Sequence, residues 1–179
     1  MTTLGVVSYL NALPLYRTLE AHGTPVIRTV PAQLCDRLVA GECDAAIMPV
    51  FDYLRGVGDE IISDACIGCD GAVRSVLLFH RGPIEEVRRV ALDASSHSSV
   101  ALLRVLLADA YHLHPEYSVH PPDVTAMLQN HDAALLIGDR ALEAAANYPE
   151  LQVFDLGTEW KKLTGLPFVF AAWVTRPGL

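Results

Sequence analysis

Uncharged hydrogen-bonding side chains gather near the start of the chain, directly after a strand-like apolar run. Ser8, Tyr9 and Asn11 follow Leu4–Val7 and precede an apolar helical pattern that contains Pro14. Helix starts attract anions through their free NH groups and positive dipole end, and hydroxyl and amide groups add further donors. The junction is therefore a candidate carboxylate site. Alternatively, Ser8 or Asn11 caps the first helix, with Pro14 in its opening turn.

The same arrangement recurs in the second half of the chain. A short strand pattern is followed by Asp93-Ala94-Ser95-Ser96-His97-Ser98-Ser99 and then by an apolar helical pattern. Because these serines exceed what one cap requires, Ser96, Ser98 and Ser99 predict a second carboxylate cradle, facing the first across a cleft. The alternative is a flexible serine-rich loop with one true cap. His97 could act as a base or as a cationic partner, or be an ordinary exposed loop histidine.

Three further residues could contact a ligand. Ser75 is a small polar residue inside an apolar strand pattern at 72–79, so it either faces solvent or points into the cleft. Gly138 ends a buried strand pattern and would let a ligand approach the backbone closely. Asp139 could also contact the ligand, although its position favours the cap of the next helix.

Strand and helix patterns alternate almost throughout, which predicts an α/β protein with largely parallel sheets. We expect strands at 4–7, 26–30, 45–48, 72–79, 90–92, 133–137 and 168–174. We expect helices at 13–21, 32–40, 99–111, 124–129 and 140–147. Hinge-like residues at 81–83 and Pro167 predict two lobes, residues 1–80 with a return strand at 168–179, and residues 81–167. A ligand cleft between such lobes is expected.

Charge and composition exclude several classes of function. The chain has 179 residues, is 51% hydrophobic, and carries 21 Asp and Glu against 13 Lys and Arg, for a net charge of -8. This acidic balance argues against nucleic acid or an anionic membrane as a partner. No apolar run approaches the roughly 18 residues of a membrane span. The start of the sequence lacks a secretory signal pattern, so a cytoplasmic location is expected.

The cysteines and the standard cofactor motifs give little support to a metal or redox function. Cys66 and Cys69 form a C-x-x-C, but they run into a turn signal, whereas a thioredoxin-like pair sits at a helix start. Cys35 and Cys43 are too widely spaced for a typical four-cysteine zinc site. Nucleotide, hydrolase and zinc-protease motifs are also missing. We therefore expect no metal and no cofactor, and a reaction that hydrogen-bond donors can promote.

Taken together, the motifs resemble the chorismate dehydratase family of the futalosine route to menaquinone. The resemblance covers essentially the whole chain and is carried by five blocks in order, 5–15, 71–78, 95–100, 135–142 and 160–173. It implies a two-lobed fold like the type II periplasmic binding proteins. It also implies cofactor-free loss of water from chorismate, which gives 3-[(1-carboxyvinyl)oxy]benzoate.

The resemblance also implies roles for the residues singled out above. Asn11 and Ser75 take the catalytic positions, and a carboxylate of the substrate is the implied base. The substrate-binding residues would be Ser8, Tyr9, Ser96, Ser98, Ser99, Gly138 and Asp139.

Two departures from the family pattern stand out. His97 occupies the place of an expected arginine, and the chain stops soon after the return strand, where a helical segment is expected to complete the first lobe. An uncovered apolar surface there would favour a homodimer. Two alternatives share the fold: a non-catalytic module that binds small carboxylates, and the later naphthoate-forming enzyme of the same pathway. The first block and the Thr-Gly-Leu-Pro-Phe segment favour the dehydratase.

Overall fold

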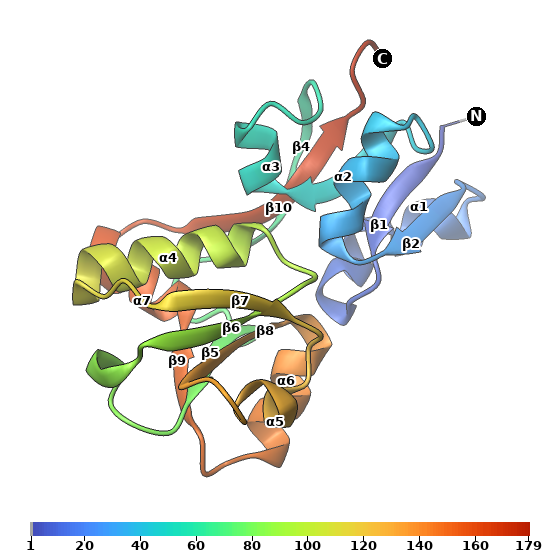
Figure 1. Ribbon diagram of the computed structural model, residues 1–179. Coiled ribbons are helices and arrows are strands. Elements are labelled where there is room, and N and C mark those ends of the chain that lie inside the picture. The colour runs from blue at the N-terminus through green and yellow to red at the C-terminus, as the bar shows by residue number, and fades with distance from the viewer. Residues whose placement is uncertain (1) are drawn as a thin grey trace. The chain divides into compact units, whose positions relative to one another are not determined.

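The computed structural model describes residues 2–179, and the chain divides into two compact units (Figure 1). Unit 1 comprises Met1–Gly68, Ser95–Ser98 and Val169–Leu179. Unit 2 comprises Cys69–Ala94 and Ser99–Phe168. The segment 95–98 thus belongs to unit 1, although its neighbours on both sides belong to unit 2.

Unit 1 is built on a five-stranded sheet of order β2-β1-β3-β10-β4. The strands are β1 (Leu4–Val7), β2 (Val26–Thr29), β3 (Ala45–Pro49), β4 (Ile61–Cys69) and β10 (Phe168–Thr175). β1 pairs in parallel with β2 and β3, and β10 runs antiparallel to β3. The helices are η1 (Leu10–Ala12, a 3-10 turn), α1 (Leu13–Ala21), α2 (Pro31–Val39) and α3 (Val50–Leu54). α2 packs against β1 and β3.

The core of unit 1 follows from its two central strands, which are buried along their whole length. Near-continuous apolar runs are typical of strands covered on both faces. Gly5 in β1 is required by close packing, because a Cβ there would lie 2.9 Å from the Ala46 Cβ and 3.0 Å from the Cys43 sulfur. The buried cluster also takes in Leu34 and Leu38 of α2.

Unit 2 repeats the plan with a five-stranded sheet of order β7-β6-β8-β5-β9. The strands are β5 (Val76–His80), β6 (Arg89–Asp93), β7 (Glu116–His120), β8 (Ala133–Ile137) and β9 (Gln152–Asp155). β6 pairs in parallel with β7 and β8, whereas β5 runs antiparallel to β8 and β9. The helices are η2 (Ile84–Glu86), α4 (Ser98–Tyr111), α5 (Val124–Met127), α6 (Gly138–Asn147) and α7 (Leu156–Thr164). α5 and α6 lie against β8, and α7 lies against β5 and β9.

The predicted α/β class is confirmed, but the expectation of largely parallel sheets is wrong in part. Each sheet is mixed, because an antiparallel strand, β10 or β5, joins next to the parallel set. The predicted strand at 72–79 is shorter, since β5 begins only at Val76. β4, β7 and β9 were not predicted. Within residues 2–179, no helix has the length and apolarity that a membrane crossing requires.

Candidate active site

The junction after β1 presents Asn11 on an exposed turn. Tyr9 keeps an extended backbone (φ -81°, ψ 153°), and η1 then leads into α1, which has Pro14 in its first turn. Neither Ser8 nor Asn11 caps a helix, because the N-cap residues are Tyr9 for η1 and Ala12 for α1, and neither makes a side-chain cap bond. The interpretation that Ser8 or Asn11 caps the first helix is therefore wrong, whereas Pro14 does lie in the opening turn of that helix. Asn11 is exposed on η1.

Ser8 is tied to the neighbouring strand rather than to the helix. Its NH donates to the Thr29 carbonyl over 3.1 Å, and its Oγ donates to the same oxygen over 3.3 Å. Thr29 ends β2. The bond pair fixes the chain where it leaves the sheet, so the backbone of the next three residues is held in place.

The serine segment 95–98 is hydrogen-bonded to other parts of unit 1. The Tyr9 hydroxyl donates to the Ser95 Oγ over 3.0 Å, and the Ala32 NH donates to the Ser95 carbonyl over 3.2 Å. The Phe51 NH donates to the Ser98 Oγ over 3.1 Å. Ser95, Ser96, Ser98 and Ser99 are all buried. The predicted alternative of a flexible loop is therefore not supported, and the structure brings Tyr9 and the serine segment together within unit 1.

His97 is paired rather than free in a loop. Its Nδ1 lies 2.7 Å from the Oδ2 of Asp52, and that oxygen also accepts from the Cys35 thiol over 3.2 Å. Asp52 and Cys35 are buried, whereas His97 is partly exposed. Burial and the hydrogen bond to Asp52 raise the pKa of the Cys35 thiol far above its ordinary value, so the thiol is protonated at neutral pH. Sequence reasoning missed Asp52, because it lies in a short helix that was not predicted.

In unit 2 the backbone joins Ser75 to Gly138. The Gly138 NH donates to the Ser75 carbonyl over 2.7 Å, and Ser75 is buried directly before β5. Gly138 has a φ of +59°, in the left-handed region that favours glycine. It is the first residue of α6, whose N-cap is Ile137. Asp139 therefore lies in the first turn, and the expectation that it caps the helix is wrong.

A buried carboxylate stands beside this junction. Asp93 ends β6 and is 2% exposed, and its Oδ2 accepts from the Ile137 NH over 3.2 Å. Burying a carboxylate is costly unless hydrogen bonds satisfy it. Asp93 therefore fixes the backbone at the start of α6, where Gly138 and Asp139 lie. Its position at the end of a strand pattern was the only sequence signal for it.

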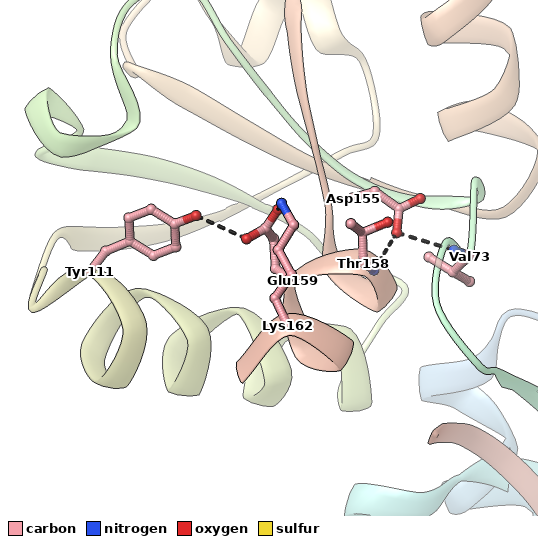
Figure 2. Close-up of polar contacts among 6 residues, drawn as sticks. All are labelled: Val73, Tyr111, Asp155, Thr158, Glu159 and Lys162. Carbon is pink, nitrogen blue, oxygen red and sulfur yellow. Dashed lines mark hydrogen bonds and ion pairs between the residues drawn. The ribbon is translucent and has the colours of Figure 1, made fainter. Parts of the chain in front are cut away.

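Asp155 organises the loop that leads into Ser75, as Figure 2 shows for two of its contacts. Its carboxylate accepts from the Thr158 NH over 2.9 Å and so caps α7. The same carboxylate accepts from the Val73 NH over 3.1 Å and from the Arg74 NH over 2.7 Å. Three backbone donors therefore converge on one side chain, and the loop is held against the start of α7.

The backbone of this loop carries strain and close packing. Arg74 has a φ of +63°, which a residue other than glycine adopts rarely. A Cβ at Gly157 would lie only 2.4 Å from the Gly71 carbonyl oxygen and 3.0 Å from the Val73 nitrogen. The hydrogen bonds to Asp155 offset the free-energy cost of the Arg74 backbone conformation. Ser75 therefore owes its position to a residue eighty positions away in the sequence, which no local pattern around Ser75 could have indicated.

The cysteines do not form a paired site. All four are free thiols, and Cys66 and Cys69 lie on β4 rather than at a helix start. A cavity of about 370 Å³ in unit 2 is lined by α5 and α6, and its lining includes none of the predicted site residues. The predicted residues form one group in each unit. In unit 1, Tyr9 lies with the serine segment, and in unit 2, Ser75 lies with Gly138.

Solved structures identify the fold. A protein of Archaeoglobus fulgidus superposes with a TM-score of 0.79 at 17% identity, covering 99% of this chain and 69% of that one. The alkanesulfonate-binding protein SsuA of Xanthomonas axonopodis gives a TM-score of 0.66 at 14% identity, with 98% and 65% covered. The periplasmic sulphonate-binding protein SsuA of Escherichia coli gives 0.61 at 19% identity, with 98% and 64% covered. The fold is that of periplasmic substrate-binding proteins.

Sequence comparison identifies the family. The family model described as menaquinone biosynthesis matches residues 2–179. The chorismate dehydratase of Thermus thermophilus is 36% identical over 97% of this chain and 69% of its own length. That of Campylobacter jejuni is 29% identical over 93% of this chain and 64% of its own. The chain belongs to this menaquinone biosynthesis family, as its sequence motifs predicted.

Proposed function

We propose that this chain is a chorismate dehydratase, a carbon–oxygen lyase that removes water from chorismate and gives 3-[(1-carboxyvinyl)oxy]benzoate. The observation that carries the proposal is the match to the chorismate dehydratase of Thermus thermophilus, which extends over 97% of the chain at 36% identity. The hydrogen-bonding groups at the strand ends suit a substrate with two carboxylates and with oxygen substituents on its ring.

In this reaction the protein needs mainly to orient the substrate and to stabilise developing charge. One ring C–H bond and the neighbouring C–O bond break, the proton and the hydroxyl leave together as water, and the ring becomes aromatic. Much of the driving force therefore belongs to the substrate. Fixing the substrate in a reactive geometry and stabilising developing charge with preorganised donors are the contributions expected of the enzyme. Such a reaction needs neither an electron carrier nor a covalent intermediate.

Asn11 would hydrogen-bond the reacting region of the substrate. It is exposed on η1, whose direction is set by the bonds of Ser8 to Thr29 and of Tyr9 to Ser95. An amide offers both a donor and an acceptor without a charge. Asn11 can therefore stabilise a change in charge on the substrate without neutralising either carboxylate.

Ser75 would orient the substrate or assist departure of the hydroxyl group. Its backbone is held from one side by Gly138 and, through the preceding loop, by Asp155. In the proposed mechanism Asp155 is a positioning residue, because its carboxylate acts on Val73 and Arg74 rather than on the substrate. A site held by backbone bonds loses little entropy when the substrate binds.

The remaining residues would bind carboxylates or shape the pocket, and a carboxylate of the substrate would serve as the base. This group comprises Ser8, Tyr9, Ser96, Ser98, Ser99, Gly138 and Asp139. The buried serine hydroxyls already have protein partners in part, for example Ser98 with the Phe51 NH. Their proposed contribution is to fix backbone NH groups and hydroxyl directions around the ligand.

The test is to incubate the purified chain with chorismate alone and to follow the products by mass spectrometry. We expect a product that is lighter by one water and shows the ultraviolet absorption of a benzoate. Ser75→Ala and Asn11→Ala should each reduce its formation strongly. If chorismate binds without change, the function is that of a carboxylate-binding module. If chorismate does not bind, this chain is not a chorismate dehydratase.

A further inference from the structure

We propose that Cys35, Asp52 and His97 form a binding site for a divalent transition-metal ion of the zinc type. This site lies wholly within unit 1 and goes beyond the proposed dehydratase function. It joins three separate pieces of the chain, because Cys35 is on α2, Asp52 is on α3 and His97 is in the serine segment 95–98.

The geometry of the three side chains suits one small cation. Their ligand atoms all lie within 4.8 Å of one another. The Asp52 Oδ2 is central, at 3.2 Å from the Cys35 sulfur and 2.7 Å from the His97 Nδ1. In a tetrahedral zinc site with bonds of about 2.0–2.3 Å, neighbouring ligand atoms lie roughly 3.5 Å apart. Small shifts of side-chain rotamers would therefore bring all three atoms around a single ion.

The donor set selects the kind of metal. A thiolate, an imidazole and a carboxylate are the ligands that zinc combines in proteins. Magnesium and calcium prefer oxygen ligands only, so a site with sulfur and nitrogen disfavours them. Three protein ligands leave a fourth tetrahedral position for water.

Burial explains why a cation would be held here. Cys35 and Asp52 are 7% and 6% exposed, so the carboxylate is withdrawn from water and has a neutral thiol as one of its partners. A buried carboxylate gains most from a partner that carries positive charge. The His97 side chain is 43% exposed and gives a metal ion a path from solvent to the two buried ligands.

Metal binding would proceed with a defined proton balance. The thiol S–H bond breaks, a metal–sulfur bond forms, and one proton passes to solvent. In the metal-bound form the imidazole is neutral: the proton between Nδ1 and Asp52 leaves to solvent and Nε2 holds the ring proton, so that Nδ1 can donate its lone pair to the metal. The Asp52 carboxylate exchanges its two hydrogen-bond donors for the metal. The structural consequence is a link between α2, α3 and the segment that carries Ser96 and Ser98.

Cobalt is the probe of choice, because Co²⁺ substitutes for zinc and reports its ligands by absorption. We would titrate the metal-free, reduced full chain with Co²⁺ and record the ultraviolet thiolate-to-metal band and the visible bands of a tetrahedral ion. The expected result is saturation at one Co²⁺ per chain, with displacement by one equivalent of Zn²⁺. The absence of a thiolate band would overturn the proposal.

Matched variants locate the ion. Cys35→Ser should abolish the thiolate band, whereas Cys66→Ser, which changes an exposed thiol on β4, should leave it unchanged. His97→Gln alters a partly exposed side chain and therefore tests the site without disturbing the core; we expect at least about tenfold weaker Co²⁺ binding. A band that survives Cys35→Ser, or that is lost in Cys66→Ser, would place the metal elsewhere. Because the readout is binding, the result does not depend on dehydratase activity.

Discussion

The two units use one plan for the sheet but different means to position their candidate catalytic residues. In both, a strand, a helix, a strand, a helix and a third strand form the parallel part of the sheet, and an antiparallel strand joins beside it. In unit 1, Asn11 lies exposed on a turn whose N-cap residue, Tyr9, makes no side-chain capping bond to that turn. In unit 2, Ser75 is buried and follows a loop that Asp155 holds by backbone hydrogen bonds.

The fold therefore depends to a different extent on the surroundings of the two candidate residues. We expect that removing the side chain of Asn11 leaves the backbone path of unit 1 unchanged, because Ser8 and Tyr9 hold that path by their hydrogen bonds. We expect that disturbing the start of α7 in unit 2 moves the loop before Ser75, because Asp155 bonds both the start of α7 and that loop. Activity and stability should therefore separate in unit 1 and change together in unit 2.

The sharpest test of this contrast is Asn11→Ala. Loss of a preorganised hydrogen-bond group at the reacting centre costs about 10²–10³ in turnover in enzymes that depend on such groups, and we expect a loss of that order in kcat. The unfolding midpoint in urea should stay within error of the unchanged chain, because Asn11 is exposed.

Asn130→Ala is the matched control, since Asn130 is also an exposed asparagine in a turn but lies outside the proposed site. We expect it to retain full turnover of chorismate. Near-normal turnover in Asn11→Ala would remove Asn11 from the mechanism, and a large loss of stability in the same variant would contradict the contrast between the units.

In unit 2, Gly157→Ala should reduce both stability and activity. The new Cβ would meet the Gly71 carbonyl at 2.4 Å and the Val73 nitrogen at 3.0 Å, so backbone must move. Overpacking of this kind costs about 1–3 kcal/mol in the free energy of unfolding. Gly82→Ala is the control, because its nearest neighbour would be the flexible Glu86 carboxylate at 3.9 Å. Equal unfolding midpoints for the two variants would show that the loop is not held by close packing.

Asp155→Asn tests the same loop through its hydrogen bonds. The carboxylate accepts from three backbone NH groups, whereas an amide has one acceptor oxygen, so at least one NH loses its partner. We expect a loss of about 1–2 kcal/mol in stability. We also expect a fall in kcat with little change in KM, because the loop positions Ser75 in the proposed mechanism. A stability loss with unchanged kcat would make Asp155 a helix cap only.

Regular elements with a strong period were predictable from sequence, as the helix at 13–21 and the strands at 4–7 and 133–137 show. β4 was missed because its pattern is weak: most of its residues are exposed, and it contains Asp64 and Gly68. The antiparallel strands β5 and β10 belong to the sheets through contacts distant in sequence, which periodicity does not contain.

The candidate site was predictable where a motif is contiguous and not where it depends on tertiary contacts. The serine segment and the residues after β1 stood out as hydroxyl-rich junctions. Asp52 and Asp93 did not, because their importance comes from burial and from partners such as His97 and Ile137. Asp155 could have been found, since aspartate is a preferred N-cap residue and Asp155 stands directly before the helix at Leu156–Thr164.

The smallest expected effect on stability comes from a contact between α4 and α7. Tyr111 of α4 donates to Glu159 of α7 over 2.9 Å, and Lys162 pairs with the same carboxylate (Figure 2). Burial, followed by the bond to Glu159, raises the pKa of Tyr111 to about 12. The unfolded value is about 10, so the folded state holds this proton more tightly. The stability that Tyr111 contributes is therefore complete below pH 10 and is lost as pH rises from about 10 to about 12.

Tyr111→Phe should cost about 1 kcal/mol or less at neutral pH, because one hydrogen bond is removed and Glu159 keeps Lys162 as a partner. Above pH 10 its stability should fall less steeply than that of the unchanged chain, which urea unfolding between pH 8 and the alkaline limit measures. Glu159→Gln should reduce the steepness only in part, since burial is the larger cause of the raised pKa. If the stability of all three chains falls in parallel with pH, the contact between Tyr111 and Glu159 does not hold α7. The hydrogen bonds of Asp155 to the loop before Ser75 would then be the feature that distinguishes unit 2 from unit 1.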